Sequence, residues 1–530
     1  MSRAASADRG RAHWLLRLLP LALPLLLFVG TGVRGLDFGQ HWDDEDKAEQ
    51  VLLVAQRGNL LPRWYHYPSV THWLCLGAMA PEYARAVERN ERGHLRTRVE
   101  RVQAWLESGA FVLRSRAIFL ACTALTLVWV YLLVLRWRGG VLEALLASSL
   151  LATSWEFAYH ARWIAPDGPL LQFATLCVLL LFCAQSSERA ARWLAAAAVA
   201  AGLACGSKYT GGLLLFFVWI EGARLSRAPS WAGRLRELAG LSALFALSYL
   251  CTTPGTLLEP LHFYEDVRFE IRHYAAGHMA HQGFAVEPGW EHLSRALRYL
   301  GFSLGSPAAP LALALCALAL AGAAATWRDS RALFFLLVGL PLAYLLLMSR
   351  QRLLFVRNLL FVAPFGALLA ARGCALVGDL LRAPRARLAW GAGLLALLGW
   401  QAAWLIAAAE GIRERGGERY LVELRDYVAA HPATRFQVSA GVRADLREAG
   451  IELPRPDAPE ASADARLVVT YPEEMLPFTR WPSNRPGLAQ AVFGPLEVNF
   501  EYYTSWIEPR ILVLSAERHA ELRALRAPSR

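Results

Sequence analysis

Apolar residues along this chain of 530 residues gather in long runs that few charged residues interrupt. Runs of roughly 18–25 apolar residues are long enough to cross the hydrocarbon core of a bilayer as helices. The pattern therefore predicts an α-helical polytopic membrane protein with about eleven membrane-spanning helices. The expected spans are residues 13–33, 112–135, 141–158, 168–185, 190–205, 209–223, 236–252, 306–324, 332–348, 353–371 and 387–408.

Two short segments on either side of Gly206 leave an alternative open. Residues 190–205 and 209–223 fit two separate spans or one broken helix, and a broken helix would invert the topology of everything downstream. The connections "RWRGG", "QSSERAARW", "ARLSRAPSWAGRLRE", "TWRDSR" and "RGCALVGDLLRAPRARL" each carry at least two Arg, which is typical of cytoplasmic loops. This bias favours eleven spans, a cytoplasmic N-terminus and an external C-terminus.

The N-terminal segment resembles a signal peptide because a basic start precedes an apolar core. Its apolar core is long, however, and no small-x-small cleavage site precedes Arg34, so we expect a retained first span. The topology then makes three large pieces external. They are a first loop at residues 34–111, a second loop at 253–296 and the tail at 410–530.

Composition supports this picture, with 55% hydrophobic residues and a mean hydropathy of +0.29. The net charge of +11 could indicate nucleic-acid binding, but the Arg-rich cytoplasmic connections explain it first. The eight cysteines form no CxxC or Cys/His spacing, so we expect neither a metal site nor a disulfide framework.

The tail differs in pattern from the rest of the chain. The stretches "RFQVSAG", "ARLVVTY" and "RILVLSAE" are typical of short strands, and residues 418–430 of a helix. We therefore divide the chain into a membrane module at 1–409 and a small soluble α/β domain at 410–530.

Four carboxylates, Asp43, Asp44, Glu45 and Asp46, follow one another in "HWDDEDKAEQ" directly after the first span. One interpretation is structural: an Asp N-cap and an acidic first turn stabilise a surface helix, here closed by Gly58 and Asn59. The other interpretation is a catalytic base. The two are compatible, because an N-cap position also fixes a carboxylate rigidly.

Charged groups near the external ends of later spans are the other candidates, because charge placed in a membrane usually marks function. Arg162 and Asp167 flank a Pro-containing turn in "YHARWIAPDGPL", where the Arg could bind phosphate or pair with the Asp. Lys208 in "GSKYTGG" could meet a lipid phosphate or simply extend to the interface. The segment is no Walker loop, because it lacks GxxxxGK[ST].

Further candidates lie in three other segments. Arg357 enters the tenth span by a turn or more, which demands a partner or water. Aromatic residues in "RWYHYP" could stack on a sugar or belong to the interfacial aromatic belt. The candidates are Arg350, Arg352 and Arg357 in "SRQRLLFVRNLLFVAP", His273 and His278 in "EIRHYAAGHMAHQG", and Tyr65 and Tyr67 in "RWYHYP".

The order of these features resembles the GT-C glycosyltransferases, in particular the dolichyl-phosphate-mannose protein mannosyltransferases and the bacterial aminoarabinose transferases. The family's Asp-Glu pair is best matched by Asp44-Glu45, and "GNLLPRWYHYPSVTHWL" follows it. "ARWIAPDGPL", "GLACGSKYTGGLLL" and "FVRNLLFVAPFGALLAARG" also resemble family segments. The resemblance covers approximately residues 14–375. The extra acid on each side of the pair departs from the pattern and leaves the choice of base open.

The resemblance implies a polyprenyl-phosphate-sugar-dependent hexosyl- or pentosyltransferase that inverts the anomeric centre and needs no cofactor or metal. It implies Asp44 as the base with Glu45 in support. Arg162, Lys208 and one or more of Arg350, Arg352 and Arg357 would bind the donor phosphate. Asp167, Tyr65, Tyr67, His273 and His278 are expected to bind substrate.

The expected partners are the lipid donor, a lipid, glycan or protein acceptor, and membrane lipids. The Ala/Leu/Arg-rich composition suggests a bacterial inner membrane with the site on the periplasmic side. Two alternatives remain: a transporter or flippase of a lipid-linked saccharide, and a non-catalytic envelope assembly protein. Against the transporter, the sequence shows no pseudo-symmetric halves.

Overall fold

The structure is a computed structural model, and it describes residues 16–37, 42–89, 95–107, 109–276, 286–306, 308–415, 419–432, 434–453, 466–470, 512–515, 517 and 520. Eight helical segments in these residues are long and apolar enough to cross a bilayer. They are η1 (Leu19–Leu21) with α2 (Ala22–Arg34), α6 (Ala110–Trp137), α9 (Asp167–Gln185), α10 (Ala190–Ser207), α16 (Ala309–Asp329), α17 (Arg331–Phe334) with η4 (Phe335–Gly339) and α18 (Leu340–Met348), α19 (Val356–Leu359) with η5 (Leu360–Val362) and α20 (Ala363–Leu380), and α21 (Pro384–Arg415). The chain is a membrane protein, as the apolar runs predicted.

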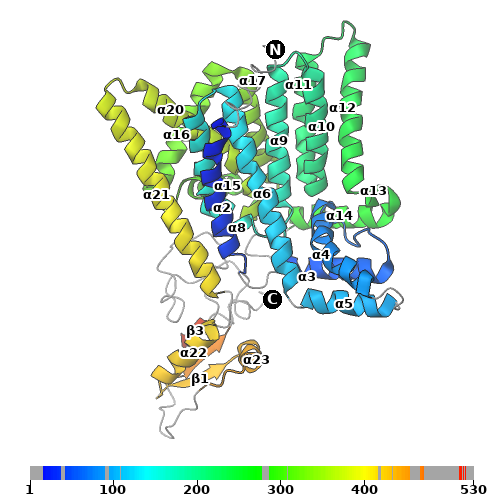
Figure 1. Cartoon of the computed structure of the whole chain (residues 1–530), viewed down its shortest axis with the longest axis vertical. Helices are drawn as coiled ribbons and strands as arrows, with labels where there is room; N and C mark the ends of the chain where they lie inside the picture. The colour runs from blue at the N-terminus through cyan, green and yellow to red at the C-terminus, as the bar shows by residue number, and fades with distance from the viewer. Residues whose placement is uncertain are drawn as a thin grey trace, which may run out of the picture.

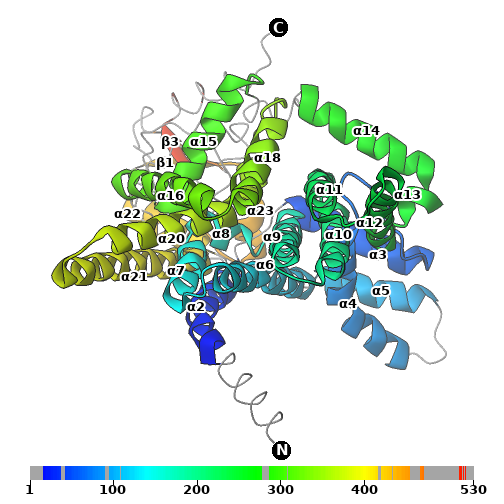
Figure 2. The same ribbon diagram turned by 90° about the horizontal axis from the view of Figure 1, so that it is seen from above.

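The other three expected spans correspond to shorter or more polar helices that run beside these segments (Figures 1 and 2). They are α7 (Val141–Ala152), α11 (Leu213–Leu225) and α12 (Trp231–Thr252). The prediction of a continuous helix over 141–158 was wrong, because α7 ends at Ala152. Helix α8 (Trp155–His160) begins after Ser154, whose backbone is extended at φ −67° and ψ 112°. Eleven crossings therefore stay a prediction.

The segment around Gly206 forms a helical hairpin rather than one broken helix. The 3₁₀ turn η2 (Tyr209–Gly212) joins α10 to α11, which pack against each other. At Gly211, a Cβ atom would collide with the backbone of Ala204 and Cys205, so the close turn requires glycine. Two separate helices at this point fit the topology that the Arg distribution favours.

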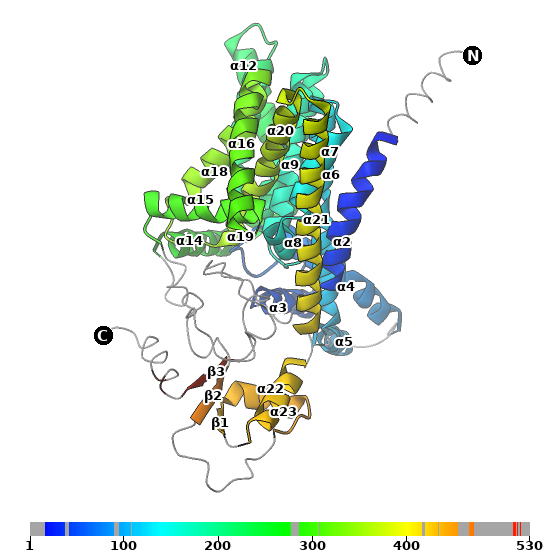
Figure 3. The same ribbon diagram turned by 90° about the vertical axis from the view of Figure 1, so that its left-hand side faces the viewer.

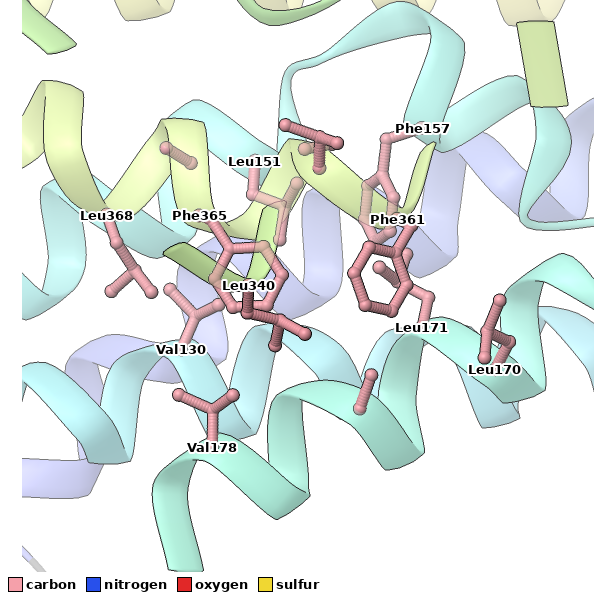
Figure 4. Packing of buried hydrophobic residues seen from close by; sticks show 14 of the residues in the cluster. Val130, Leu151, Phe157, Leu170, Leu171, Val178, Leu340, Phe361, Phe365 and Leu368 are labelled. Atoms are coloured by element: carbon pink, nitrogen blue, oxygen red, sulfur yellow. The ribbon is translucent and has the colours of Figure 1, made fainter. Parts of the chain in front are cut away.

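One cluster of buried apolar side chains runs through the bundle (Figure 4). Val, Leu and Phe side chains from α6, α9, α18 and α20 interdigitate in it, among them Val130, Leu171, Leu340 and Phe365. The helices α16 and α20 approach closely because Gly322 and Gly373 face the partner backbone, where no Cβ atom would fit. This packing fixes α20 and, through η5, α19, which carries Arg357 and Asn358.

Several helices gather at one end of the bundle, and we call this end the cap end (Figures 1 and 3). They are α3 (Trp42–Arg57), α4 (Val70–Arg89), α5 (Leu95–Glu107), α13 (Gly255–Leu258), α14 (Pro260–Ala276) and α15 (Trp290–Gly305). Helices α3, α4 and α5 share an apolar cluster that includes Val51 and Cys75, and Phe119 joins this cluster to α6. As predicted, α3 contains the acidic run and stops before Gly58, whose φ of 64° suits glycine. The expected Asp N-cap was wrong, because the helix begins at Trp42 and Asp43 and Asp44 lie in its first turn.

The tail contains α22 (Arg419–Ala430), β1 (Arg435–Val438), α23 (Ala440–Glu448), β2 (Arg466–Thr470) and β3 (Leu512–Ser515). The three strands and α22 lie where the sequence pattern predicted strands and a helix, whereas α23 was not predicted. β2 is the central strand, parallel to β1 with Arg435 opposite Arg466, and antiparallel to β3. Leu424, Val442 and Val469 pack between the helices and the sheet. That 410–530 forms an independent soluble domain stays a prediction.

Candidate active site

A buried cluster of charges lies at the cap end, where α9, α10 and α19 meet. Asp167 is the first residue of α9, Lys208 follows α10, and Arg357 lies in α19. The Lys208 ammonium is 2.8 Å from one Asp167 oxygen, and the Arg357 Nε is 4.0 Å from the other. The three side chains are only 5–6% exposed. Sequence reasoning named all three residues separately, and the structure brings them together.

A buried ion pair keeps its charges only when further hydrogen bonds satisfy them. Lys208 also donates to the side-chain oxygen of Asn358 at 2.5 Å. The backbone oxygen of Asn358 in turn accepts from the Tyr344 hydroxyl at 2.9 Å, and its side-chain nitrogen is 3.4 Å from the Tyr274 hydroxyl. This network fixes the ammonium in place, so Lys208 is no flexible side chain reaching for the interface.

Two adjoining cavities open beside the cluster. The polar cavity, of about 360 Å³, contains Arg357, and the apolar cavity, of about 260 Å³, contains Lys208. The polar cavity is lined by Asp46, Lys47, Glu49, Gln50, Trp64, His66, Tyr67, Phe269, Glu270, His273, Phe355 and Arg357. The apolar cavity is lined by His66, Tyr67, Lys208, Tyr209, Thr210, Val267, Glu270, Ile271, Tyr274, Leu347, Met348 and Gln351. The two cations thus lie where a polar and an apolar compartment meet.

Tyr67 connects the cations with the loop that follows α3. Its hydroxyl lies 3.4 Å from an Arg357 nitrogen, and its ring centre is 5.9 Å from the Lys208 ammonium. A cation close to an aromatic ring is attracted by the electron-rich face. Tyr67 therefore lies at the predicted substrate site, in both cavities.

Tyr65 was expected to bind substrate, but it lies outside the two cavities. Its side chain is fully buried and lines neither of these cavities. The hydroxyl donates to Glu259 at 2.5 Å, its amide donates to Asp266 at 2.6 Å, and its carbonyl accepts from Tyr209 at 2.7 Å. Burial first, and then Glu259, raise the pKa of the Tyr65 phenol. Tyr65 thus anchors the loop to α14 and to the hairpin at η2.

Arg162 is buried at the end of α2 rather than in the Lys208 cluster. It donates to the Gly35 carbonyl at 2.9 Å, while Arg116 donates to the Leu36 carbonyl at 2.9 Å. Burial, together with the neighbouring Arg116, lowers the pKa of Arg162 to about 10, so the guanidinium stays protonated at neutral pH. The two arginines hold the C-terminus of α2, just before the acidic run.

The remaining predicted residues divide into three groups. His273 lines the polar cavity, whereas Arg350 and Arg352 are exposed and line neither cavity. The side chains of Asp44 and Glu45, and the whole of His278, lie outside the described residues. The member of the acidic run with a described side chain, Asp46, lines the polar cavity with Arg357.

Sequence reasoning missed five residues of the site. Asn358 carried a signal, because a second polar residue beside Arg357 in an apolar run needs a buried partner. His66 lies in "RWYHYP", and Glu270 and Tyr274 lie in "EIRHYAAGHMAHQG", where neighbouring residues were named instead. The missed residues are Asn358, Tyr344, Tyr274, His66 and Glu270. Within the described residues, no group of three or more His, Cys, Asp or Glu could hold a metal ion.

We compared the sequence and the fold of this chain with those of known proteins. Residues 101–225 match the family model of dolichyl-phosphate-mannose-protein mannosyltransferases. ArnT from Cupriavidus metallidurans bound to undecaprenyl phosphate superposes with a TM-score of 0.51 at 14% identity, over 87% of this chain and 94% of that chain. Its apo state gives 0.49 at 14% identity, over 88% and 94%. The apo oligosaccharyltransferase from Archaeoglobus fulgidus gives 0.46 at 13% identity, over 84% of this chain and 60% of that chain.

Among curated proteins, none matches the sequence of this chain. The match to the mannosyltransferase model and the superposition on ArnT confirm the predicted resemblance to the GT-C glycosyltransferases. The matched stretch contains Arg162, Asp167 and Lys208, whereas Arg357 lies beyond it.

Proposed function

We propose that this membrane protein, which has the fold of the GT-C glycosyltransferases, transfers a sugar from a polyprenyl-phosphate donor to an acceptor hydroxyl with inversion. The observation that carries the proposal is the position of Lys208 and Arg357 between the apolar and the polar cavity. A polyprenyl-phosphate sugar has an apolar tail, an anionic phosphate and a polar sugar in this order. The apolar cavity, the cations and the polar cavity offer matching environments in the same order.

The chemistry of the leaving group explains the need for two cations. When the sugar–phosphate bond breaks, negative charge grows on the lipid phosphate, and fixed donors in a water-poor site stabilise it strongly. Lys208 and Arg357 would supply this stabilisation without a proton transfer. The relative ArnT was crystallised with undecaprenyl phosphate, which is consistent with a donor of this class.

The acceptor needs a base, and we assign this role to Asp44, with Glu45 in support. The carboxylate would take the proton of the acceptor hydroxyl as the hydroxyl oxygen attacks the anomeric carbon of the sugar. Helix α3, which begins in the acidic run, lines the polar cavity through Asp46, Glu49 and Gln50. This supports a base on α3, and the choice among the four acids belongs to experiment.

The test is transfer by the purified protein in nanodiscs. Undecaprenyl-phosphate mannose, glucose and aminoarabinose serve as donors, and lipids and proteins of a deletion strain serve as acceptors. Asp44→Asn is expected to lower the turnover by about 10²–10⁴-fold, the range of a lost acid–base group. Asp43→Asn is the matched control, and Glu45→Gln and Asp46→Asn test the two remaining acids of the run. If folded Asp44→Asn transfers at the wild-type rate, the assignment of the base is wrong.

We further propose a bacterial plasma membrane with the cap end on the periplasmic side. The Arg-rich connections at the opposite end support this orientation. Mass spectrometry of glycolipids and glycoproteins in the deletion strain would identify the acceptor. Lipid translocation without any glycosyl product, in the wild type and in all variants, would contradict the transferase and favour a transporter.

A further inference from the structure

Three side chains, His66, Tyr67 and Glu270, line both the polar and the apolar cavity. They therefore form the boundary between the two compartments. If the proposed function holds, the donor phosphate lies at Lys208 and Arg357, and its sugar points into the polar cavity. The first carbons of that sugar then lie beside these three side chains.

Glu270 is held at this boundary from both sides along α14. One turn before it, Asp266 accepts the amide of Tyr65 at 2.6 Å, which ties α14 to the loop. One turn after it, the Tyr274 carbonyl accepts the amide of Arg352 at 3.0 Å, which ties α14 to the chain after α18. Because residues four apart lie on one helix face, the carboxylate sits between two fixed points. A recognition group needs such a rigid support.

His66 reaches the same boundary from the loop after α3. Its ring centre lies 5.0 Å from that of Phe269, which in turn is 5.9 Å from that of His273. Its Nδ1 is buried and has no hydrogen-bond partner within the described part of the chain. A buried nitrogen without a partner costs free energy, and a ligand hydroxyl in the cavity would remove that cost.

We propose that Glu270 and His66 recognise the donor sugar by hydrogen bonds to the hydroxyl groups on C2 and C3, the two ring carbons that follow its anomeric carbon. A carboxylate can accept from two neighbouring hydroxyls, and an imidazole offers one donor or acceptor more. The substrate class is therefore a polyprenyl-phosphate sugar with free neighbouring hydroxyls. A site built to hydrogen-bond a hydroxyl rejects the analogue that lacks it, because its own polar groups are left unpaired.

The test compares two ligands on the full-length protein in nanodiscs, undecaprenyl phosphate and undecaprenyl-phosphate mannose, by isothermal titration calorimetry. Mannose is replaced by glucose or aminoarabinose if the wild type prefers one of these. Glu270→Gln is expected to bind the sugar-bearing lipid about 10-fold or more weakly, and undecaprenyl phosphate as tightly as the wild type. Glu265→Gln on the exposed face of the same helix is the control for lost charge and should bind both ligands normally.

A second readout is the response to a 2-deoxy donor. The wild type should bind it more weakly than the parent sugar donor, and Glu270→Ala or His66→Ala should reduce this difference. Unchanged binding of every sugar donor by Glu270→Gln and His66→Ala would overturn the inference. Failure of the wild type to bind even undecaprenyl phosphate would instead contradict the proposed function, so the two failures are distinguishable.

Discussion

Two clusters of charged residues stand at opposite ends of the same helix bundle. At the cap end, Lys208 and Arg357 share Asp167. At the opposite end, Arg372 of α20 lies 3.0 Å from Asp329 at the end of α16. The second cluster extends further, because Arg138 lies 3.6 Å from Asp329 and 3.6 Å from Glu143. Both clusters therefore tie several spans together.

The clusters differ in what lies next to them. The cap-end cluster is almost fully buried, yet it borders two cavities lined by polar and aromatic side chains. The opposite-end cluster lines neither cavity, and its Asp329 and Arg138 are 25% and 33% exposed. Buried charge alone therefore does not identify a site. Charge becomes a candidate for catalysis where the fold leaves room beside it for a substrate.

Among changes that test this comparison, the largest effect is expected for Lys208→Met, which removes the ammonium and keeps an apolar chain of similar length. Loss of one donor to a developing oxyanion typically lowers turnover by about 10²–10³-fold. We therefore expect a loss of this size in kcat/KM, measured as sugar transfer per folded protein. Transfer within threefold of the wild type would contradict a role of Lys208 at the phosphate.

A smaller effect is expected for Arg357→Lys, which keeps the charge and removes the planar guanidinium. The hydrogen-bonding geometry at Tyr67 and at a phosphate is then lost, because an ammonium cannot bind in the same two-pronged way. Donor titrations should show kcat/KM lowered by about 10–100-fold, given about 1.5–3 kcal/mol for a hydrogen bond to a charged group. A value equal to that of the wild type would mean that charge alone matters here.

The next largest effect is expected for Tyr65→Phe. This variant tests whether Tyr65 affects transfer only by holding the loop after α3 in place. The variant loses the hydrogen bond to Glu259 and keeps the buried ring. We expect the KM for the donor to rise by about 3–10-fold with kcat almost unchanged, the equivalent of about 1 kcal/mol. A large fall in kcat at unchanged KM would place Tyr65 in the chemistry instead.

The smallest effect on transfer is expected for Arg372→Met, the matched partner of Lys208→Met in the other cluster. It leaves Asp329 without its shortest ion pair, and breaking a buried pair costs about 3–5 kcal/mol. Because Asp329 is partly exposed, we expect a loss of about 1–3 kcal/mol, measured as a lower melting temperature. Transfer per folded protein should stay within threefold of the wild type. A selective loss of transfer would remove the distinction between the clusters.

The sequence was informative about single residues and poor about their pairing. Arg357 inside an apolar run demanded a partner, but Asp167 and Tyr67 are too distant in the chain to be recognised as that partner. Lys208 fitted an interfacial side chain equally well until the network with Asn358 was known. Tyr65 and Tyr67 differ by two positions in one motif, yet one anchors the loop and the other lines the cavities.

In the fold, too, features that depend on local sequence were predicted and features that depend on tertiary packing were not. Long apolar runs identified the eight clear spans, because length and hydropathy are local properties of the sequence. The break after Ala152 was not predicted, since the apolar run continues through Trp155 and Phe157 while the backbone turns at Ser154. The three strands of the tail were found because short alternating runs between turn residues are also local. Which helices line the cavities depends on tertiary packing.

The most direct test of the central claim is a cryo-electron microscopy structure of the protein with undecaprenyl phosphate. We predict the phosphate within hydrogen-bond distance of the Lys208 ammonium, with the prenyl chain leaving through the apolar cavity. A phosphate bound elsewhere, with Lys208 still paired only to Asp167 and Asn358, would contradict the account.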